Sequence, residues 1–276
     1  MLIVTHRLGE VSDHAHRTTV LRDGEVVLET GPSAAHDELV NAMVGRTSDE
    51  AIASHHELAQ RKVDRTNAPV LRVAGLPGAG FVEDVSFEVH GGEILGIAGI
   101  GGSGTSEVAR MLSGAEHREG GEIEIDGKRA GKHWDARHAI NSGVCFLPQD
   151  RHAEGGVLTL SLEQNVSLPR YDDYFMKTKA ERSDIDGVIK ALDVQPPDRT
   201  KTFAEFSGGN QQKALLGKWL QLNPRVLVLD DPTYGVDPNA RETLLHKVAE
   251  LAEGGAAVVV ISTEPEQLAR VSDRVL

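Results

Sequence analysis

Two short runs of the chain contain only apolar residues, and they constrain its fold more than any other feature. Residues 226–229 read Val-Leu-Val-Leu, and residues 256–261 contain only Ala, Val and Ile. A strand buried on both faces has such an uninterrupted run, as in a parallel sheet covered by helices. Stretches with helical spacing at 210–221 and 240–251 alternate with these runs. The order of strand, helix and strand predicts an α/β fold with a mostly parallel sheet.

Local patterns divide the chain into two units. Asp23 and Gly24, set between β-rich runs, predict a hairpin, because both residue types tolerate a positive φ. The polar, charge-mixed residues 46–68 predict a linker, after which a second unit begins at Val70. The expected strands are one that ends at Val4 and those at 18–21, 26–28, 70–73, 82–89, 94–98 and 122–125, with helices at 35–45, 105–112 and 179–192.

Composition excludes several classes of protein. The 276 residues carry 29 Lys and Arg against 42 Asp and Glu, a net charge of −13, whereas a dedicated nucleic-acid binder needs a basic surface. No apolar run approaches the roughly 20 residues that span a bilayer, and the first residues do not resemble a signal peptide. A single cysteine, Cys145, excludes a disulfide framework and is predicted to be a small buried residue in a strand.

A glycine-rich turn follows the strand expected at 94–98. Glycines let a backbone curl so that its N–H groups point at a phosphate, and the start of a helix adds partial positive charge. A serine hydroxyl just after the last glycine is placed to bind Mg²⁺. The pattern predicts either a phosphate-binding loop or an ordinary strand–helix turn. The candidate residues are Gly99, Gly102, Ser103, Gly104, Thr105 and Ser106.

Two further motifs carry polar chemistry. Asp230 and Asp231 end an apolar strand, where the first could hold Mg²⁺ and the second could orient or deprotonate water; a solvated acidic turn is the alternative. Upstream, Ser207-Gly208-Gly209-Asn210-Gln211-Gln212-Lys213 begins a helix with a hydroxyl and exposed N–H groups. A simple helix cap explains its start, but not the whole string together with its position shortly before Asp230.

The two ends of the chain are similar to each other. Arg17-Thr18-Thr19-Val20 aligns with the segment that begins at Arg274, at an offset of 257 residues, and His6 then falls on Thr263. This similarity predicts that the chain begins at one point of a repeat and stops near the same point of the next.

The order and spacing of these motifs resemble an ABC transporter ATPase, a P-loop NTPase with an antiparallel β subdomain around residues 70–95 and 121–128 and a helical signature subdomain around 160–220. Asn210-Gln211-Gln212-Lys213 and Pro148-Gln149-Asp150-Arg151 resemble the duplicated sugar-import type, ribose, galactose or xylose. The resemblance makes residues 1–46 the end of a first cassette, 47–69 a linker, and 70–276 a second cassette that is truncated at its C-terminus. It suggests a fragment or truncated reading frame whose hairpin at 18–30 docks where a closing hairpin is missing.

The resemblance assigns roles to individual residues. The cofactors it implies are ATP and Mg²⁺. Asp231 stands at the catalytic carboxylate, Gln149 is the loop glutamine that senses Mg²⁺ and faces the permease, and His6 is the switch histidine of the first cassette. The phosphates would be wrapped by the loop residues Gly99, Gly102, Ser103, Gly104, Thr105 and Ser106; Mg²⁺ would meet Ser106, Gln149 and Asp230; and a nucleotide on the opposite cassette would be clasped by Ser207, Gly208, Gly209, Gln211 and Asp237.

Three departures from the family pattern weaken hydrolysis at this loop. Thr105 replaces the lysine that would meet the β and γ phosphates, and Asp231 replaces a longer glutamate. Thr263 stands where the second cassette would have its histidine. A displacement of about 1 Å in a reacting group can cost on the order of a hundredfold in rate.

The expected function is the ATP-binding and ATP-hydrolysing subunit of a sugar importer, peripheral at the cytoplasmic face of the membrane. Its expected partners are a first ABC cassette, transmembrane permease subunits and, indirectly, a sugar-binding protein, with no nucleic acid. A nucleoside importer and a non-hydrolytic regulatory cassette remain as alternatives. A soluble phosphate-loop kinase or GTPase is disfavoured, since those enzymes do not need the string that begins at Ser207.

Overall fold

The computed structural model describes residues 2–5, 11, 13–22, 24–31, 36–44, 63–77, 84–170 and 180–276. Its centre is a five-stranded sheet in the order β11-β5-β10-β9-β8, in which every neighbouring pair is parallel. This confirms the α/β prediction. The strands are β5 (Ile94–Ala98), β8 (Val144–Leu147), β9 (Val226–Asp230), β10 (Ala257–Ser262) and β11 (Arg274–Val275).

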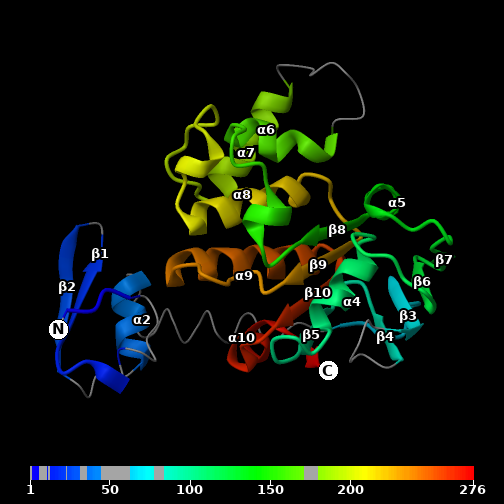
Figure 1. The fold of residues 1–276 in the computed structure, drawn as a ribbon, viewed down its shortest axis with the longest axis horizontal. Helices are drawn as coiled ribbons and strands as arrows, with labels where there is room; N and C mark the ends of the chain where they lie inside the picture. Colours follow the sequence, from blue (N-terminus) through cyan, green and yellow to red (C-terminus); the bar gives the residue numbers. More distant parts are fainter. Residues whose placement is uncertain are drawn as a thin grey trace.

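The apolar runs of the central strands serve two cores, one on each face of the sheet. Leu227 and Leu229 point into a core shared with α6, α7, α8 and α9, whereas Val226 and Val228 point into a core shared with α4 and a second sheet. Successive strand residues face opposite sides, so both faces demand apolar side chains. Helices pack above and below the sheet (Figure 1). They are α4 (Thr105–Leu112), α5 (Ala136–Asn141), α6 (Leu162–Ser167), α7 (Ala180–Ala191), α8 (Gly208–Leu220), α9 (Pro238–Glu253) and α10 (Pro265–Val271).

The second sheet is antiparallel and has the order β4-β3-β6-β7. The expected β subdomain is present, although β5 belongs to the central sheet. Its strands are β3 (Leu71–Leu76), β4 (Val85–Val89), β6 (Glu122–Ile125) and β7 (Lys128–Arg129). The helical subdomain contains α6, α7 and α8, with a π-helix and two 3₁₀ turns: η1 (Arg151–Gly155), η2 (Leu168–Arg170) and η3 (Phe203–Glu205).

The N-terminal unit forms its own small sheet. Among the described residues, strands β1 (Thr18–Arg22) and β2 (Glu25–Thr30) pair only with each other. Helix α2 (His36–Val44) packs on them and contacts α9. Figure 1 shows this unit at the left of the view, apart from the central sheet. The prediction that the hairpin docks on that sheet is therefore wrong. The β5 edge is already paired with β11, and the Leu276 N–H extends the pairing to the Gly96 carbonyl.

Two other predictions can be compared with the structure. Residues 2–5 form no strand, so the strand expected to end at Val4 is absent from the described residues. Cys145 lies buried in β8 as expected, and burial raises the pKa of its thiol to about 12. Residues 47–62, most of the proposed linker, and His6 lie outside the described part of the chain. None of the described helices is both long and apolar enough to cross a membrane.

Candidate functional site

The glycine-rich turn joins the end of β5 to the start of α4. Gly102 and Gly104 have φ values of +81° and +94°, a left-handed backbone that favours glycine. A Cβ on Gly99 would lie only 2.5 Å from the Ser103 hydroxyl, so the loop closes tightly on itself. The loop therefore directs its backbone toward the N-terminal end of α4, where partial positive charge attracts a phosphate.

Ser106 and Asp230 meet beside this loop, although 124 positions separate them. The Ser106 hydroxyl donates to Asp230 Oδ1 over 3.1 Å. Asp230 is the last residue of β9 and only 3% exposed. Burial raises its pKa to about 6, against the opposing effect of the Ser106 hydrogen bond. A buried carboxylate with a raised pKa is short of positive charge, which a cation would supply.

The Asp231 carboxylate accepts hydrogen bonds from three residues in two parts of the chain. Its φ of +41° turns the backbone sharply after β9. Gln149 Nε2 donates to Asp231 Oδ2 over 2.9 Å, and Oδ1 accepts from Ser262 Oγ over 2.9 Å and from the Thr263 N–H over 3.0 Å. The structure thus brings together Gln149, Asp231 and Thr263. Because these donors occupy both carboxylate oxygens, an attacking water would have to displace one of them.

Thr105 places a hydroxyl where a lysine would carry charge. Its Oγ1 lies 3.4 Å from Ser103 Oγ. A cation that the sequence reasoning missed lies one helical turn further on. Arg110 forms an ion pair with Glu154 of η1 and acts to lower the pKa of Asp230. The i to i+4 spacing from Ser106 to Arg110 places both on one face of α4, a signal that was available in the sequence.

The serine–glycine motif begins α8 on another part of the surface. Ser207 is the N-cap residue, and its Oγ accepts from Asn210 Nδ2 over 2.9 Å. A Cβ on Gly209 would lie 2.7 Å from Asp237 Oδ2, so Asp237 packs against the motif. Asp237 also caps α9 by accepting from the Ala240 N–H over 3.0 Å.

Gln211 does not lie where a nucleotide clasp requires it. It is buried, its Nε2 donates to the Phe203 carbonyl over 3.0 Å, and its Oε1 lies 3.1 Å from His152 Nε2. Both ends of the amide are occupied inside the protein. Asn210 is partly exposed and hydrogen-bonded to Ser207, so it is better placed to face a ligand.

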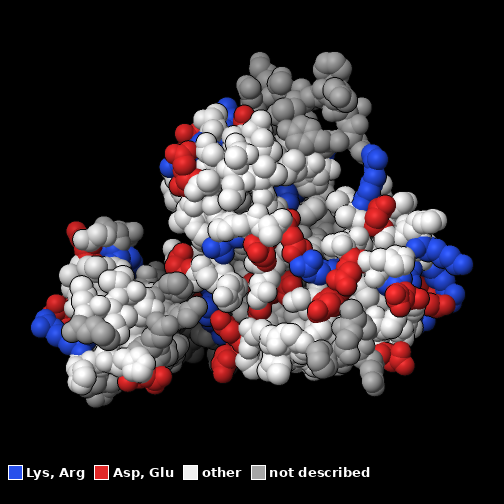
Figure 2. All heavy atoms as spheres, in the orientation of Figure 1, with Lys and Arg blue, Asp and Glu red and all other residues white. Residues whose placement is uncertain are grey.

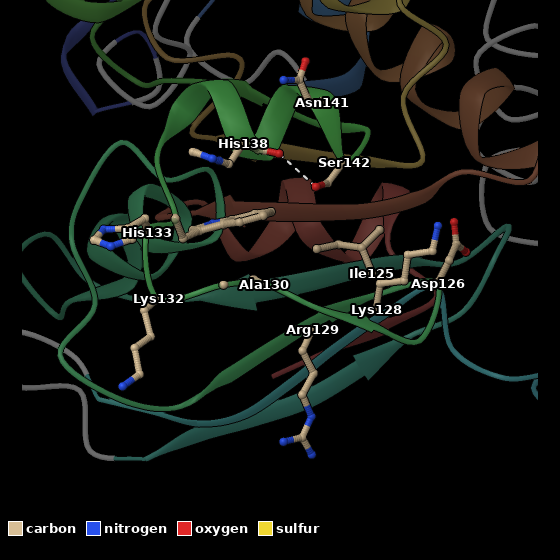
Figure 3. Close-up of a pocket in the computed structure, with 12 residues that line it drawn as sticks. Ile125, Asp126, Lys128, Arg129, Ala130, Lys132, His133, His138, Asn141 and Ser142 are labelled. Carbon is tan, nitrogen blue, oxygen red and sulfur yellow. Dashed lines mark hydrogen bonds between the residues drawn. The ribbon is translucent and has the colours of Figure 1, made fainter.

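One pocket lies away from these motifs. A cavity of about 490 Å³ separates the β6–β7 turn from α5, and its cationic residues do not converge, since Arg129 and Lys132 point away from it (Figure 3). Arg129 pairs with Glu122 and Glu124, and basic and acidic side chains lie intermixed at the right edge of Figure 2. Among the described residues, no group of three or more His, Cys, Asp or Glu could hold a metal ion.

The chain is similar to proteins of one family. The ABC transporter family model matches residues 82–234. The ribose import ATP-binding proteins of Clostridium tetani and Streptomyces avermitilis are 34% and 36% identical to it over 100% of this chain and over 54% and 52% of their own lengths. The chain thus spans about half the length of these curated relatives.

Solved structures share the fold. The dimeric structure of MJ0796, a bacterial ABC transporter cassette, gives a TM-score of 0.66 at 21% identity, over 75% of this chain and 93% of that one. The structure of an ATP-binding subunit of an ABC transporter gives 0.61 at 25% identity, over 75% and 85%.

Proposed function

Because the chain belongs to the ABC transporter family, we propose that it is part of the ATP-binding component of a sugar importer. The relatives described above are named ribose import ATP-binding proteins, which favours a monosaccharide as the transported solute. The proposal rests on one observation above all, the hydrogen bond of 3.1 Å between Ser106 and Asp230 beside a glycine loop that opens a helix. A loop suited to phosphate, after β5, and a carboxylate suited to a cation, at the end of β9, thus lie side by side.

The donor set fits Mg²⁺. Ser106 offers a hydroxyl, Asp230 a buried carboxylate and Gln149 a side-chain carbonyl, all hard oxygen ligands. Mg²⁺ usually takes one or two protein groups and completes its shell with water and phosphate oxygens, so no closed cage of side chains is needed. When bound, the ion would neutralise charge on the β and γ phosphates.

The chain's own groups divide the remaining work. The loop N–H groups from Gly99 to Ser106 would bind phosphate oxygens, and Asp231 would orient water with Gln149. Thr105 supplies no positive charge to the phosphates, and both oxygens of Asp231 are already hydrogen-bonded. We therefore expect slow hydrolysis at this loop. A non-hydrolytic regulatory cassette is the second candidate, and the occupied oxygens of Asp231 favour it.

Two exposed surfaces are suited to protein partners. Ile100 in the glycine loop is 81% exposed and Tyr234 after β9 is 55% exposed, which favours contact with a second cassette across the nucleotide. A separate groove of about 380 Å³ is lined by apolar residues that include Phe146, Pro148 and Trp219. It adjoins Gln149, so a permease segment there would sit beside the nucleotide site. Such docking would place the chain at the cytoplasmic face of the membrane as a peripheral subunit.

Calorimetric titration of the purified chain with MgATP tests this proposal. We expect binding that requires Mg²⁺ and weakens at least about tenfold in Ser106→Ala, since the variant loses a ligand for the ion. Ser142→Ala, at an exposed helix end in the β-subdomain region, is the matched control and should bind like the parent chain. Binding that does not depend on Mg²⁺, or that is equal in Ser106→Ala, would contradict the assignment.

Hydrolysis separates the two candidate functions. Phosphate release is measured for the chain alone and after addition of a first cassette with an intact phosphate loop, and Asp231→Asn serves as the control for the chain's own site. Activity that appears only with the first cassette supports a composite ATPase. MgATP binding with no phosphate release in either mixture supports the regulatory cassette.

A further inference from the structure

One short segment, residues 149–151, contacts both the residues around the glycine loop and the serine–glycine motif that begins α8. Gln149 follows β8 and donates to Asp231, in the group around the glycine loop. Two residues later Arg151 opens η1, and its Nη1 donates over 3.2 Å to the carbonyl of Tyr234, in the turn that leads to Asp237. The Arg151 N–H in turn donates to the Gln149 carbonyl over 3.1 Å, so the two residues are tied into one turn.

The same guanidinium lies against the first residue of α8. A Cβ on Gly208 would be 2.7 Å from Arg151 Nη2 and 3.2 Å from its Cζ. No real Cβ comes that close, so only glycine at 208 allows this approach. Gly235 is also near, since its Cβ would lie 3.8 Å from Nη1. Arg151 therefore bridges the start of α8 and the turn between Tyr234 and Asp237.

Charge pairing does not explain this position. In the described part of the chain Arg151 forms no ion pair, although its charge helps to lower the pKa of Asp150, and its Nε is buried without a hydrogen-bond partner. The adjacent Asp150 carboxylate accepts instead from the N–H groups of His152 and Ala153. Helix α8 has no acidic residue in its first turn. The planar guanidinium thus donates to a backbone carbonyl and packs against a glycine. Both contacts depend on the orientation of the guanidinium more than on its charge.

We propose that Arg151 is a positioning residue that couples the chain's own phosphate site to its Ser207-Gly208-Gly209 motif and to the Tyr234–Asp237 turn. This inference rests on the proposed function. A ligand held by Ser106, Asp230 and Asp231 would compete with Gln149 for the Asp231 carboxylate, to which Gln149 donates. The turn from Gln149 to Arg151 transmits that displacement to Tyr234 and Gly208, so filling one nucleotide site adjusts the geometry that the chain presents to the other.

Hydrogen exchange of the full chain with and without MgATP tests the coupling. The readout is the exchange rate of the hydrogen-bonded amides of Gln211, Tyr234 and Val236. In the parent chain we expect MgATP to change these rates by about fivefold. In Arg151→Gln we expect that change to disappear while MgATP affinity, measured by calorimetry, stays within about twofold. Arg129→Gln, which alters an exposed arginine on β7, is the matched control and should keep the full change.

The variant Arg151→Lys tests whether the coupling depends on the shape of the guanidinium or only on its charge. Lysine keeps the charge but lacks the planar fork, so we expect it to behave like Arg151→Gln. Full coupling in Arg151→Lys, or in Arg151→Gln, would overturn the proposal, as would a parent chain that binds MgATP without any change at these amides. Circular dichroism confirms that each variant is folded before exchange is compared.

A second hydrogen-exchange experiment tests the coupling without nucleotide. Gln149→Ala removes the contact with Asp231, so we expect it to speed exchange at Tyr234 and Val236 in the parent background and to leave the rates unchanged in the Arg151→Gln background. Equal acceleration in both backgrounds would refute the coupling. A chain that fails to bind MgATP at all would contradict the proposed function, while this second experiment would still decide the role of Arg151.

Discussion

Replacing Asp230 with asparagine should stabilise the chain while removing its cation site. Burial raises the pKa of Asp230 from 3.8 to about 6, so the ionised carboxylate is unfavourable in the folded state. At about 1.4 kcal/mol per pKa unit, this costs about 3 kcal/mol of folding free energy above pH 6. Asparagine is neutral and can still accept a hydrogen bond from Ser106. We therefore expect Asp230→Asn to raise the free energy of unfolding at about pH 7.5 by up to about 3 kcal/mol.

The dependence on pH identifies the cause. The folded chain binds the Asp230 proton more tightly than the unfolded chain, so this group lowers stability as pH rises from about 4 to 6. Near pH 5 about half of the cost remains, and the advantage of Asp230→Asn should shrink by between about 1 and 2 kcal/mol. The negative charges of Asp231 and Glu154 also raise the pKa of Asp230, and the positive charge of Arg110 lowers it.

Urea unfolding without Mg²⁺ or nucleotide, at about pH 7.5 and about pH 5, measures the effect. Asp126→Asn is a control of opposite sign, because the Arg225 guanidinium holds the pKa of Asp126 below its ordinary value. That variant should lose stability by nearly the same amount at both pH values, because both lie above the ordinary Asp pKa of 3.8. A stability change in Asp230→Asn that is equal at both pH values, or a loss at pH 7.5, would refute the electrostatic reasoning.

Three further outcomes are expected. Gly114→Ala should destabilise by more than about 3 kcal/mol in urea unfolding, because its Cβ would lie 2.3 Å from the backbone carbon of Asp135 at a φ of +68°; Gly127→Ala has open space at a similar φ and should cost only about 1 to 2 kcal/mol. Asp237→Ala removes the cap of α9 and should cost about 1 kcal/mol, which Asp237→Asn should largely restore. Cys145, whose thiol pKa burial raises to about 12, should react with a thiol reagent near pH 8 only after denaturation; rapid reaction of the native chain would contradict its burial.

Elements with strong local signals could be predicted from the sequence. The predicted bounds of β5, α4 and β6 match the structure, because apolar runs and glycine turns mark their ends. The short elements α5, α6 and η1 were not identified, since six residues or fewer carry too little periodicity to recognise. The prediction that the N-terminal hairpin docks on the central sheet was wrong for another reason. Strand pairing depends on which sheet edge is free, and the repeat similarity does not show that β11 takes the edge of β5.

For the candidate site, the sequence indicated which motif residues belong together, but not the side chains that pack around them. The family resemblance groups Ser106, Gln149 and Asp230 at one Mg²⁺ site. The structure joins Ser106 to Asp230 and Gln149 to Asp231, and parallel strands end at the same edge of the sheet. The resemblance does not show that Ser262 fills Asp231 Oδ1, or that Gln211 turns inward to Phe203. Those contacts depend on side-chain packing between segments far apart in the chain, for which a single sequence carries no direct signal.

The residues around Asp231 and those around Ser207 differ in how many of their polar groups already have partners within the protein. This difference bears on the mechanism. Around Asp231 every acceptor already has a protein donor, and Thr105 brings no charge to a phosphate. Around Ser207, the helix start has no acidic residue in its first turn, the Arg151 guanidinium lies against Gly208, and the Asp237 carboxylate lies against Gly209. On the proposed function, a γ-phosphate carried by another cassette would meet this surface. The chain would then contribute more to hydrolysis at a partner's phosphate loop than at its own, with Arg151 as the contact through which its own site influences that reaction.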